Sequence, residues 1–275
     1  MTTVPDDLSP LDRILARSAR APRRILFPDA DDPVMIDALA RLVGENIVVP
    51  CVRASHVCGE LPGGVCLLDP GAGEDGSTLP VDGELIRAAT PVEESLPRFH
   101  LLELATPTES GETVLAFACG GRTATPARLA AVARATADQF RKLCETEPRV
   151  ALLSFSTHGS ARHPAVDTVR AAVEDLLGEK PGFAVGGELQ GDAALVPAVA
   201  ASKAPGDPVA GRANVLVFPD DDSAEIGRAL VERLGGGRAA GPFTAGTARP
   251  VNSLSRDASA EAIVLAAAVT ALQAG

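Results

Sequence analysis

The sequence predicts an α/β protein with two α/β domains, mostly parallel sheets flanked by helices, and a cleft between the domains. The length of 275 residues suits one large domain or two moderate ones. Apolar segments at 24–27 and 47–52 flank an amphipathic segment that begins at Asp32-Pro33, and such a strand–helix–strand unit favours parallel pairing. Between 187 and 256, polar and glycine-rich turns follow apolar strands, and ligands of open α/β sheets bind at those strand ends.

The composition indicates a sizeable core and an acidic surface. Hydrophobic residues make up 46% of the chain and charged residues 22%, which argues against wholesale disorder. Aromatic residues are only 3%, so Ala, Val and Leu must fill the core. The net charge of -11 argues against nucleic acid as a partner. An anionic ligand would therefore need local help from arginines or helix N-termini.

The cysteines predict neither a metal site nor a disulfide framework. They stand at positions 51, 58, 66, 119 and 144, an odd number with no zinc-like spacing. Reduced thiols in the cytoplasm are the plain interpretation. No apolar run approaches the ~20 residues that a membrane span needs, and the acidic start does not resemble a signal peptide. We therefore expect a cytoplasmic protein with no membrane partner.

Hydrophobic periodicity predicts the order of helices and strands. Strands are expected at 24–27, 47–52, 65–68, 99–104, 113–119, 149–154, 183–185 and 214–218, with 99–104 and 113–119 forming a hairpin. Helices are expected at 11–18, from 32 to beyond 43, from 125 to about 145, and at 164–177, 223–234 and 258–273. The last helix is apolar nearly all round and should be buried. The predicted apolar faces are Ile36, Leu39, Ala40 and Val43 in the second helix, and Ile226, Leu230 and Leu234 in the fifth.

The first candidate site is the segment Ser156-Thr157-His158-Gly159-Ser160, between a strand and a helix. Small hydroxylic residues and glycine let backbone N–H groups approach an anion closely. From this pattern alone, an ordinary polar turn remains the alternative. No catalytic role is assigned to His158, because a lone loop histidine more often makes structural hydrogen bonds. His163, which precedes Pro164, is expected to cap or flank the next helix.

The second candidate site runs from Asn252 to Arg256. Ser255 or Asp257 can cap the final helix, whose N-terminus carries a partial positive charge. Arg256 adds a cation that can hold a phosphate with two hydrogen bonds, although a solvated arginine at a helix start is the alternative. A third group, Lys203-Ala204-Pro205 with Gly211-Arg212, lies in predicted turns, where surface turn chemistry is equally reasonable.

Several long motifs resemble the phosphate acetyltransferase/phosphate butyryltransferase family. They read G-E-L-Q-x-D-A-A at 187–194, S-K-A-P-x-x-P-V-A-G-x-A-x-V-x-V-F-P-D at 202–220 and P-V-N-x-L-S-R at 250–256. The segments 154–161 and 24–33 add to the resemblance, which covers most of the chain from Arg24 onward. The resemblance implies a fold like that of isocitrate and isopropylmalate dehydrogenases. It also implies a first domain of residues 1–146 completed by 244–275, and a second domain of residues 147–243.

The resemblance further implies transfer of an acyl (acetyl) group between coenzyme A and phosphate by a homodimer. Coenzyme A or acyl-CoA is then a substrate, and no cofactor is permanently bound. The Ser-Arg pair of the last motif corresponds to Ser255 and Arg256 as catalytic residues. Arg256 would hold the phosphate of the acyl phosphate, and Ser255 would stabilise charge on the acyl oxygen. The implied substrate-binding residues are Ser156, Thr157, Gly159, Ser160, Lys203, Pro205 and Asn252.

Three departures from the family pattern bear on activity. The family's general base, an acidic residue six positions after the motif arginine, is replaced by Ala262, with Glu261 and Asp257 nearby. An acidic run at 220–222 replaces an Asn- and Gly-containing turn. An Arg-bearing segment of the family is missing between Val52 and Phe99, where Arg87 and Arg98 are the nearest candidates.

These departures leave two alternatives to the family reaction. One is a non-catalytic module that binds acyl-CoA or acyl phosphate, as the related C-terminal domain of some malic enzymes does. The other is an acyltransferase repurposed for a different acceptor. Acyl transfer to phosphate is the preferred hypothesis.

Overall fold

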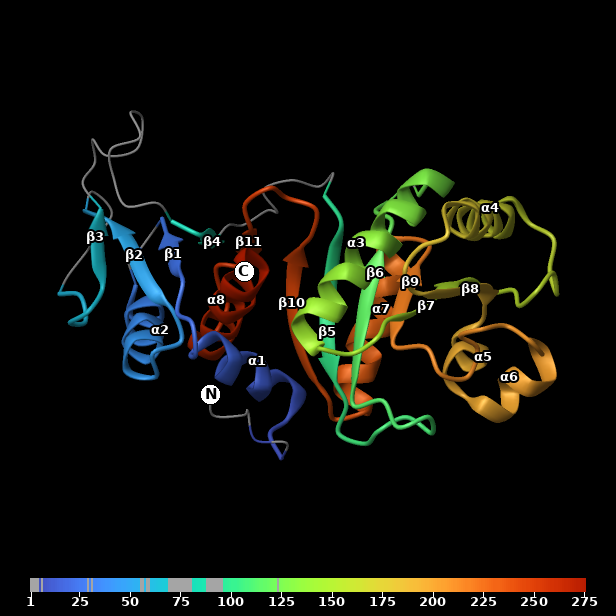
Figure 1. Ribbon diagram of the computed structural model, residues 1–275, viewed down its shortest axis with the longest axis horizontal. Coiled ribbons are helices and arrows are strands. Elements are labelled where there is room, and N and C mark those ends of the chain that lie inside the picture. The colour runs from blue at the N-terminus through green and yellow to red at the C-terminus, as the bar shows by residue number, and fades with distance from the viewer. Residues whose placement is uncertain are drawn as a thin grey trace. The chain divides into compact units, whose positions relative to one another are not determined.

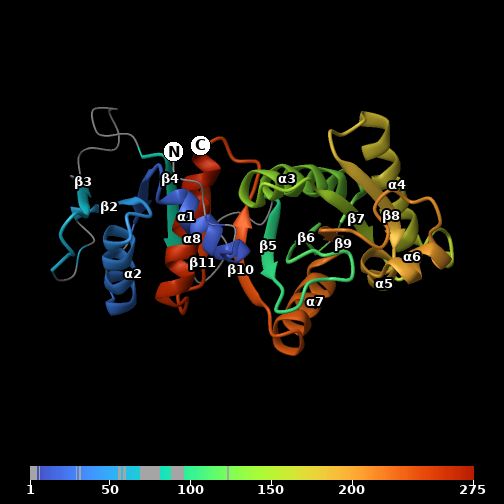
Figure 2. The same cartoon turned by 60° about the horizontal axis from the view of Figure 1, so that its bottom comes forward.

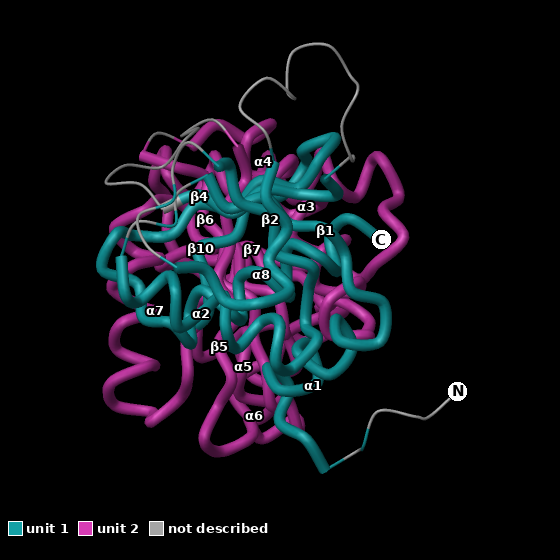
Figure 3. Tube along the Cα trace, turned by 90° about the vertical axis from the view of Figure 1, so that its left-hand side faces the viewer, with its two compact units in different colours: residues 1–94, 240–275 teal, residues 95–239 magenta. Residues whose placement is uncertain are grey.

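The computed structural model (Figure 1) describes residues 5, 7–28, 30, 32–54, 57, 60–68, 81–87, 96–122 and 124–275. The helices are α1 (Pro10–Ser18), α2 (Pro33–Gly44), α3 (Pro126–Cys144), α4 (Pro164–Glu179), α5 (Gly191–Leu195), α6 (Pro197–Lys203), α7 (Asp221–Leu234) and α8 (Ala260–Ala274). The strands are β1 (Arg24–Phe27), β2 (Val49–Arg53), β3 (Cys66–Leu68), β4 (Gly83–Arg87), β5 (Arg98–Glu103), β6 (Val114–Cys119), β7 (Arg149–Leu153), β8 (Ala184–Leu189), β9 (Val215–Phe218), β10 (Arg238–Thr244) and β11 (Val251–Leu254). The chain divides into two compact units, shown in different colours in Figure 3.

Unit 1 consists of Met1–Glu94 and Ala240–Gly275. Its five strands pair in parallel in the order β11-β4-β1-β2-β3. Helix α8 packs against β1, β4 and β11, and α1 and α2 pack against α8. Because α8 is surrounded in this way, its buried residues run without a break from Ile263 to Ala271. This confirms the prediction of a buried final helix.

Unit 2 consists of Ser95–Ala239. Its strands β5, β6, β9, β7 and β8 belong to a sheet with the order β10-β5-β6-β9-β7-β8, and β10 spans the unit boundary between residues 239 and 240. β5 and β6 form the predicted antiparallel hairpin, whereas β6, β9, β7 and β8 run parallel to one another. Figure 2 shows α3 on one side of this sheet and α7 on the other. The two mostly parallel sheets with flanking helices agree with the predicted fold class, while the cleft between domains stays a prediction.

The boundary between the compact units differs from the predicted domain boundary. Residues 95–146, expected in the first domain, lie in unit 2. The physical reason is strand pairing, since β6 pairs with both β5 and β9 and so joins the hairpin to the second sheet. The chain does return to unit 1 near its C-terminal end, at Ala240 rather than at residue 244.

Side-chain caps fix the starts of three predicted helices. Asp32 accepts a hydrogen bond from the Met35 N–H at 2.9 Å, and Thr125 accepts one from the Arg128 N–H at 3.2 Å. His163 caps α4, because its Nδ1 accepts from the Ala165 N–H at 3.1 Å. Each helix also begins with proline, which lacks an N–H that would otherwise need a partner.

The two predicted apolar faces have different outcomes. The face predicted for α2 is wrong in part, because its buried side is formed by Met35, Ala38, Leu39 and Leu42, and Ala40 is exposed. On α7, Ile226, Leu230 and Leu234 are 61%, 53% and 82% exposed. Their spacing was read correctly as one helical face, but that face points away from the core.

Three strands and two short helices were not predicted. β4 carries few consecutive apolar residues, and β10 contains Gly241-Pro242, which suggests a turn. β10 lies at the edge of its sheet, where a missing proline N–H can be tolerated. β11 was read as part of a ligand-binding turn, and α5 and α6 fall in motifs that were likewise read as turns.

Candidate functional site

The predicted anion-binding loop, residues 154–161, joins β7 to α4 in unit 2. His158 and Gly159 have φ angles of 45° and 82°, so the chain turns through the left-handed region at both positions. Glycine adopts this conformation easily, but histidine does so much less often. Ser156 and Thr157 are buried, whereas residues 158–160 are exposed. The loop therefore has a buried base and an exposed tip.

A buried carboxylate, that of Glu188 at the end of β8, holds this loop from inside. Its Oε1 accepts hydrogen bonds from the Ser156 hydroxyl at 2.8 Å and the Gly159 N–H at 2.7 Å. Its backbone carbonyl accepts the His158 N–H at 3.1 Å. The side chain is 2% exposed and lies 3.7 Å from the Arg170 guanidinium, which offsets its charge. Glu188 thus occupies the place that an external anion was expected to take.

Three further N–H groups of the loop have acceptors within it. The Thr157 N–H donates to the Ser160 hydroxyl at 3.0 Å, and the Ala161 N–H donates to the Ser156 hydroxyl at 3.1 Å. The Ser160 N–H donates to the Thr157 carbonyl at 3.0 Å. An incoming anion would find these donors already engaged. Ser156 and Thr157 therefore shape the loop, and Ser160 is the hydroxyl that it exposes.

A second buried carboxylate, that of Asp207, links the loop to the following motif. It accepts backbone N–H groups from Val209 at 2.9 Å, Ala210 at 3.0 Å and Gly187 at 3.2 Å. Its Oδ2 also lies 3.0 Å from Nε2 of His158. A Cβ atom at position 186 would come within 2.2 Å of this carboxylate, so the close packing requires glycine there.

Sequence reasoning assigned no role to Glu188 or Asp207, although both lie in the quoted motifs. The available signal was an acidic residue within a glycine-containing stretch at a predicted strand end. A carboxylate in such a place needs donors, and neighbouring backbone N–H groups supply them. That argument could have found both residues.

Lys203 lies at the end of α6 and is engaged by side chains of the motif that begins at residue 187. Its ammonium donates to Asp192 at 2.8 Å and to the Gln190 side-chain carbonyl at 3.1 Å. The hydrogen bond from Lys203 lowers the pKa of Asp192 below its usual value. Gln190 in turn donates its backbone N–H to the Thr157 hydroxyl at 2.9 Å. Lys203 is thereby joined to the predicted loop, with its charge offset by a carboxylate.

A cavity of about 360 Å³ lies beside these motifs, within unit 2. Small residues of the α6 region form much of its wall, including the predicted site residue Pro205. Asp207, Ser110 and Arg212 contribute the polar part. The Arg212 guanidinium donates to the Pro208 carbonyl at 2.8 Å. Such a wall suits a small, largely apolar group better than a phosphate.

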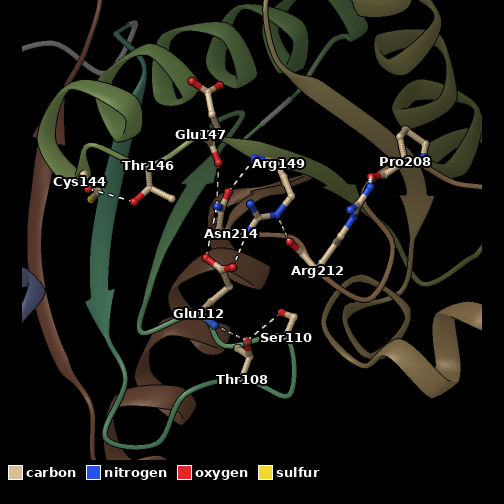
Figure 4. A network of polar contacts seen from close by, with 10 residues as sticks. All are labelled: Thr108, Ser110, Glu112, Cys144, Thr146, Glu147, Arg149, Pro208, Arg212 and Asn214. Carbon is tan, nitrogen blue, oxygen red and sulfur yellow. Dashed lines mark hydrogen bonds and ion pairs between the residues drawn. The ribbon is translucent and has the colours of Figure 1, made fainter.

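A polar network braces this region of unit 2 (Figure 4). Arg149 forms an ion pair with Glu112 and donates to the Arg212 carbonyl at 2.6 Å. The buried Asn214 side chain accepts the Arg149 N–H at 2.7 Å and donates to the Glu147 carbonyl at 3.0 Å. These contacts join the β5–β6 turn to the segment that carries Arg212. We interpret the network as structural, because its members satisfy one another.

The predicted catalytic pair lies in unit 1, in the turn between β11 and α8. Ser255, Arg256 and Asp257 are all exposed there. The Ser255 hydroxyl donates to the Asp257 carboxylate. The prediction that Ser255 or Asp257 caps the final helix is wrong, because the cap is Ser259, whose hydroxyl accepts the Ala262 N–H at 3.2 Å. The serine and arginine therefore precede the helix by a short turn.

Asn252, a predicted substrate-binding residue, is fully buried in unit 1. Its amide donates to the Thr270 hydroxyl at 2.8 Å and to the Gln273 side chain at 2.7 Å. Its carbonyl accepts the Thr244 N–H at 2.8 Å. Asn252 thus ties β10 and β11 to α8, and a ligand could reach it only if these contacts opened.

The structure bears differently on two of the three departures from the family pattern, the acidic run and the missing Arg-bearing segment. Asp220 caps α7, since its side chain accepts the Ser223 N–H at 2.8 Å, and Asp221 accepts the Cys119 thiol at 2.9 Å. The side chain of Arg87 and much of the segment between Val52 and Phe99 lie outside the described residues.

Across the described part of the chain, no cluster of three or more His, Cys, Asp or Glu side chains could hold a metal ion, and no helix has both the length and the hydropathy to cross a membrane.

Comparison with known proteins identifies relatives along the whole chain. Residues 101–271 match the family model described as "Phosphate acetyl/butaryl transferase". A phosphate acetyltransferase from Paracoccus denitrificans is 34% identical over 321 aligned residues, which cover 97% of this chain and 99% of the relative. A phosphate acetyltransferase from Thermoanaerobacterium thermosaccharolyticum is 54% identical over 146 residues, which cover 53% of this chain but 44% of that relative.

A solved structure is similar to the complete chain as well. The phosphotransacetylase EutD from Staphylococcus aureus has a TM-score of 0.79 at 25% sequence identity. The superposition covers 97% of this chain and 98% of the other.

Proposed function

Because this chain belongs to the phosphate acetyl/butaryl transferase family, we propose that it transfers an acyl group, with acetyl as the first candidate, between coenzyme A and phosphate. The observation that carries the proposal is the 34% identity to a phosphate acetyltransferase over 97% of the chain. That span includes both candidate sites. Coenzyme A takes part as a substrate, and no permanently bound cofactor is part of the proposal.

In unit 1, we assign the phosphate-binding role to Arg256. Its position in an exposed turn, next to an exposed hydroxyl, supports this assignment. A guanidinium can hold two phosphate oxygens at once. Ser255 can donate a hydrogen bond to the acyl oxygen as negative charge develops there, once its hydroxyl turns away from Asp257. The reaction then needs no covalent enzyme intermediate.

In unit 2, we assign the exposed tip of the 154–161 loop to substrate binding. Gly159 and Ser160 are exposed and can contact a ligand directly. Ser156 and Thr157 contribute through the shape that they give the loop. Lys203 can contact the diphosphate of coenzyme A only in competition with Asp192, and Pro205 offers an apolar surface.

We also propose a cytoplasmic homodimer. The exposed stripe of Ile226, Leu230 and Leu234 on α7 supports association, because water contact of such a face is unfavourable. In a two-fold dimer, the same stripe of each copy would face that of the other. Leu230→Glu should convert the dimer to a monomer in light scattering, with Arg41→Ala on α2 as control. A wild-type protein that is monomeric at all concentrations contradicts the assignment.

The direct test is thiol release from acetyl-CoA by the purified protein, with and without phosphate. The proposal predicts release that depends on both phosphate and enzyme. Calorimetry with coenzyme A runs beside it. Binding without release would instead support the acyl-CoA-binding module or a different acceptor, and absence of both would reject all three functions.

A further inference from the structure

His158 and Asp207 form a histidine–carboxylate pair at the exposed tip of the 154–161 loop. Nε2 of His158 lies 3.0 Å from Oδ2 of Asp207. The Asp207 side chain is 3% exposed, whereas that of His158 is 37% exposed. A buried carboxylate thus holds one edge of an imidazole whose other edge is accessible to ligand.

The backbone fixes both partners. Three N–H groups, from Gly187, Val209 and Ala210, hold the Asp207 carboxylate in one orientation. His158 has a φ of 45°, a conformation that non-glycine residues rarely adopt, and its N–H is bound by the Glu188 carbonyl at 3.1 Å. Unusual backbone conformations that the surroundings enforce are concentrated at functional sites.

Asp207 also selects the tautomer of the ring. A carboxylate that accepts three N–H groups is an acceptor towards His158 as well, so Nε2 carries the proton in the neutral imidazole. Nδ1 then presents a lone pair and can take up a proton. This is the arrangement by which a buried carboxylate turns a histidine into a general base.

We propose that His158, oriented by Asp207, is the proton acceptor for the coenzyme A thiol. The inference rests on the proposed acyl transfer, which requires the thiol to lose its proton before sulfur attacks the acyl carbon. Nδ1 takes the S–H proton, the S–C bond forms, and the C–O bond to phosphate breaks with its electron pair on the phosphate oxygen. The imidazolium then releases the proton to solvent. In the reverse direction, it protonates the leaving thiolate.

The other charged groups near the loop are paired with partners of opposite charge. Glu188 lies 3.7 Å from the Arg170 guanidinium, and Lys203 lies 2.8 Å from Asp192. Asp207 is the carboxylate that contacts the His158 ring.

The test is His158→Asn, because asparagine tolerates the left-handed conformation but cannot accept the proton. We expect kcat for thioester formation from coenzyme A and acetyl phosphate to fall by about 10²–10⁴, with KM for coenzyme A little changed. Added imidazole should restore part of the rate, which a purely structural defect would not allow.

Asp257→Asn and Glu261→Gln serve as comparisons, because their carboxylates are the other candidate proton acceptors in unit 1. Both variants should lose less kcat than His158→Asn, and added imidazole should not raise their rates. If one of them loses kcat by about 10²–10⁴ while His158→Asn retains wild-type kcat, the assignment is overturned.

A separate measurement distinguishes this inference from the proposed function. In wild-type protein with isotope-labelled histidine, the ring signals of His158, identified with the His158→Asn variant, should shift when coenzyme A is added. Unmoved signals overturn the role of His158 even if the enzyme is active. An inactive enzyme whose His158 signals do shift rejects phosphate acyl transfer but retains the placement of the ring next to coenzyme A.

Discussion

The loop at 154–161 in unit 2 and the turn at 255–259 in unit 1 were predicted to do similar work, yet they are built in opposite ways. The loop closes around the buried Glu188 carboxylate, which accepts hydrogen bonds from the Ser156 hydroxyl and the Gly159 N–H. Within the loop, the Thr157 N–H donates to the Ser160 hydroxyl. The turn exposes both Ser255 and Arg256. A motif therefore contains two kinds of residue, those that build the local backbone and those that face the ligand. Burial and hydrogen-bond partners separate them, whereas the letters of the motif do not.

Within unit 1, the largest effect should come from the turn. Arg256→Ala removes the cation assigned to phosphate, and we expect kcat/KM for acetyl phosphate to fall by about 10²–10³. Arg256→Lys keeps the charge without the two-pronged geometry and should recover part of the loss. Steady-state rates of thioester formation provide the measurement.

Arg41→Ala is a matched control, because Arg41 pairs with Glu45 on the surface of α2. It should leave the rate unchanged. If Arg256→Ala also has the wild-type rate, the turn does not face the ligand and the contrast with the 154–161 loop is wrong.

Acidification should destabilise unit 2 more than unit 1. The pKa of His100 in β5 is lowered to about 4, and burial of the ring is the main cause. In an unfolded chain the pKa of histidine is about 6.5. The unfolded state therefore binds more protons below pH 6.5, and stability that is complete above that pH is lost as pH falls towards 4. The loss amounts to up to about 3 kcal/mol. Peptide-resolved hydrogen exchange should show it in the unit 2 sheet.

His100→Gln removes the titrating group and should abolish this acid sensitivity. Peptides from α8 in unit 1 serve as the internal control. Equal acid sensitivity of unit 2 in the variant and the wild type would show that another group is responsible.

Substitutions of Glu188 test whether its buried carboxylate holds the 154–161 loop in shape. Glu188→Ala leaves a buried hydroxyl and a buried N–H without an acceptor, which should lower the free energy of unfolding by about 2–3 kcal/mol. Exchange at residues 156–161 should accelerate. Glu188→Gln keeps Oε1 as an acceptor for Ser156 and Gly159, so it should restore most of the protection. Fast exchange in both variants alike would show that charge, rather than hydrogen bonding, holds the loop.

Asn252→Ala should have the smallest effect and a different character from Arg256→Ala. It removes the amide that joins β10 and β11 to α8 and should cost about 1–2 kcal/mol of stability. Well below the unfolding temperature, kcat should stay close to wild type. A large fall in kcat without a loss of stability would return Asn252 to the ligand-binding residues. Urea unfolding followed by circular dichroism, together with steady-state kinetics, decides between these outcomes.

Most of the fold was predictable because its signals are local. Caps such as Asp32 and Thr125, each followed by proline, fixed helix starts. The apolar spacing of Leu129, Val132, Ala133, Thr136 and Phe140 gave the buried face of α3. The edge strand β10 escaped prediction because Gly241-Pro242 has turn-like propensities and only pairing with β5 makes it a strand. Periodicity identified the stripe on α7 as one helical face, but periodicity cannot show whether a face is buried or exposed.

The candidate site was predictable as a set of segments, but not residue by residue. The motifs placed the loop and the turn after strands, as the structure has them, whereas Lys203 was predicted in a turn and lies at the end of α6. They could not show that the amide of Asn252 points into unit 1, or that Asp207 reaches His158, because both depend on contacts between segments far apart in the chain. The roles of Glu188 and Asp207 follow from their donors, which the structure shows.

The central claim, acyl transfer between coenzyme A and phosphate, is tested most directly in the direction of thioester synthesis. Purified protein would be mixed with coenzyme A and acetyl phosphate, and thioester absorbance and released phosphate would be followed together. The account predicts thioester and phosphate in equal amounts, at a rate proportional to enzyme concentration. Phosphate release without thioester, or no reaction at all, would contradict it.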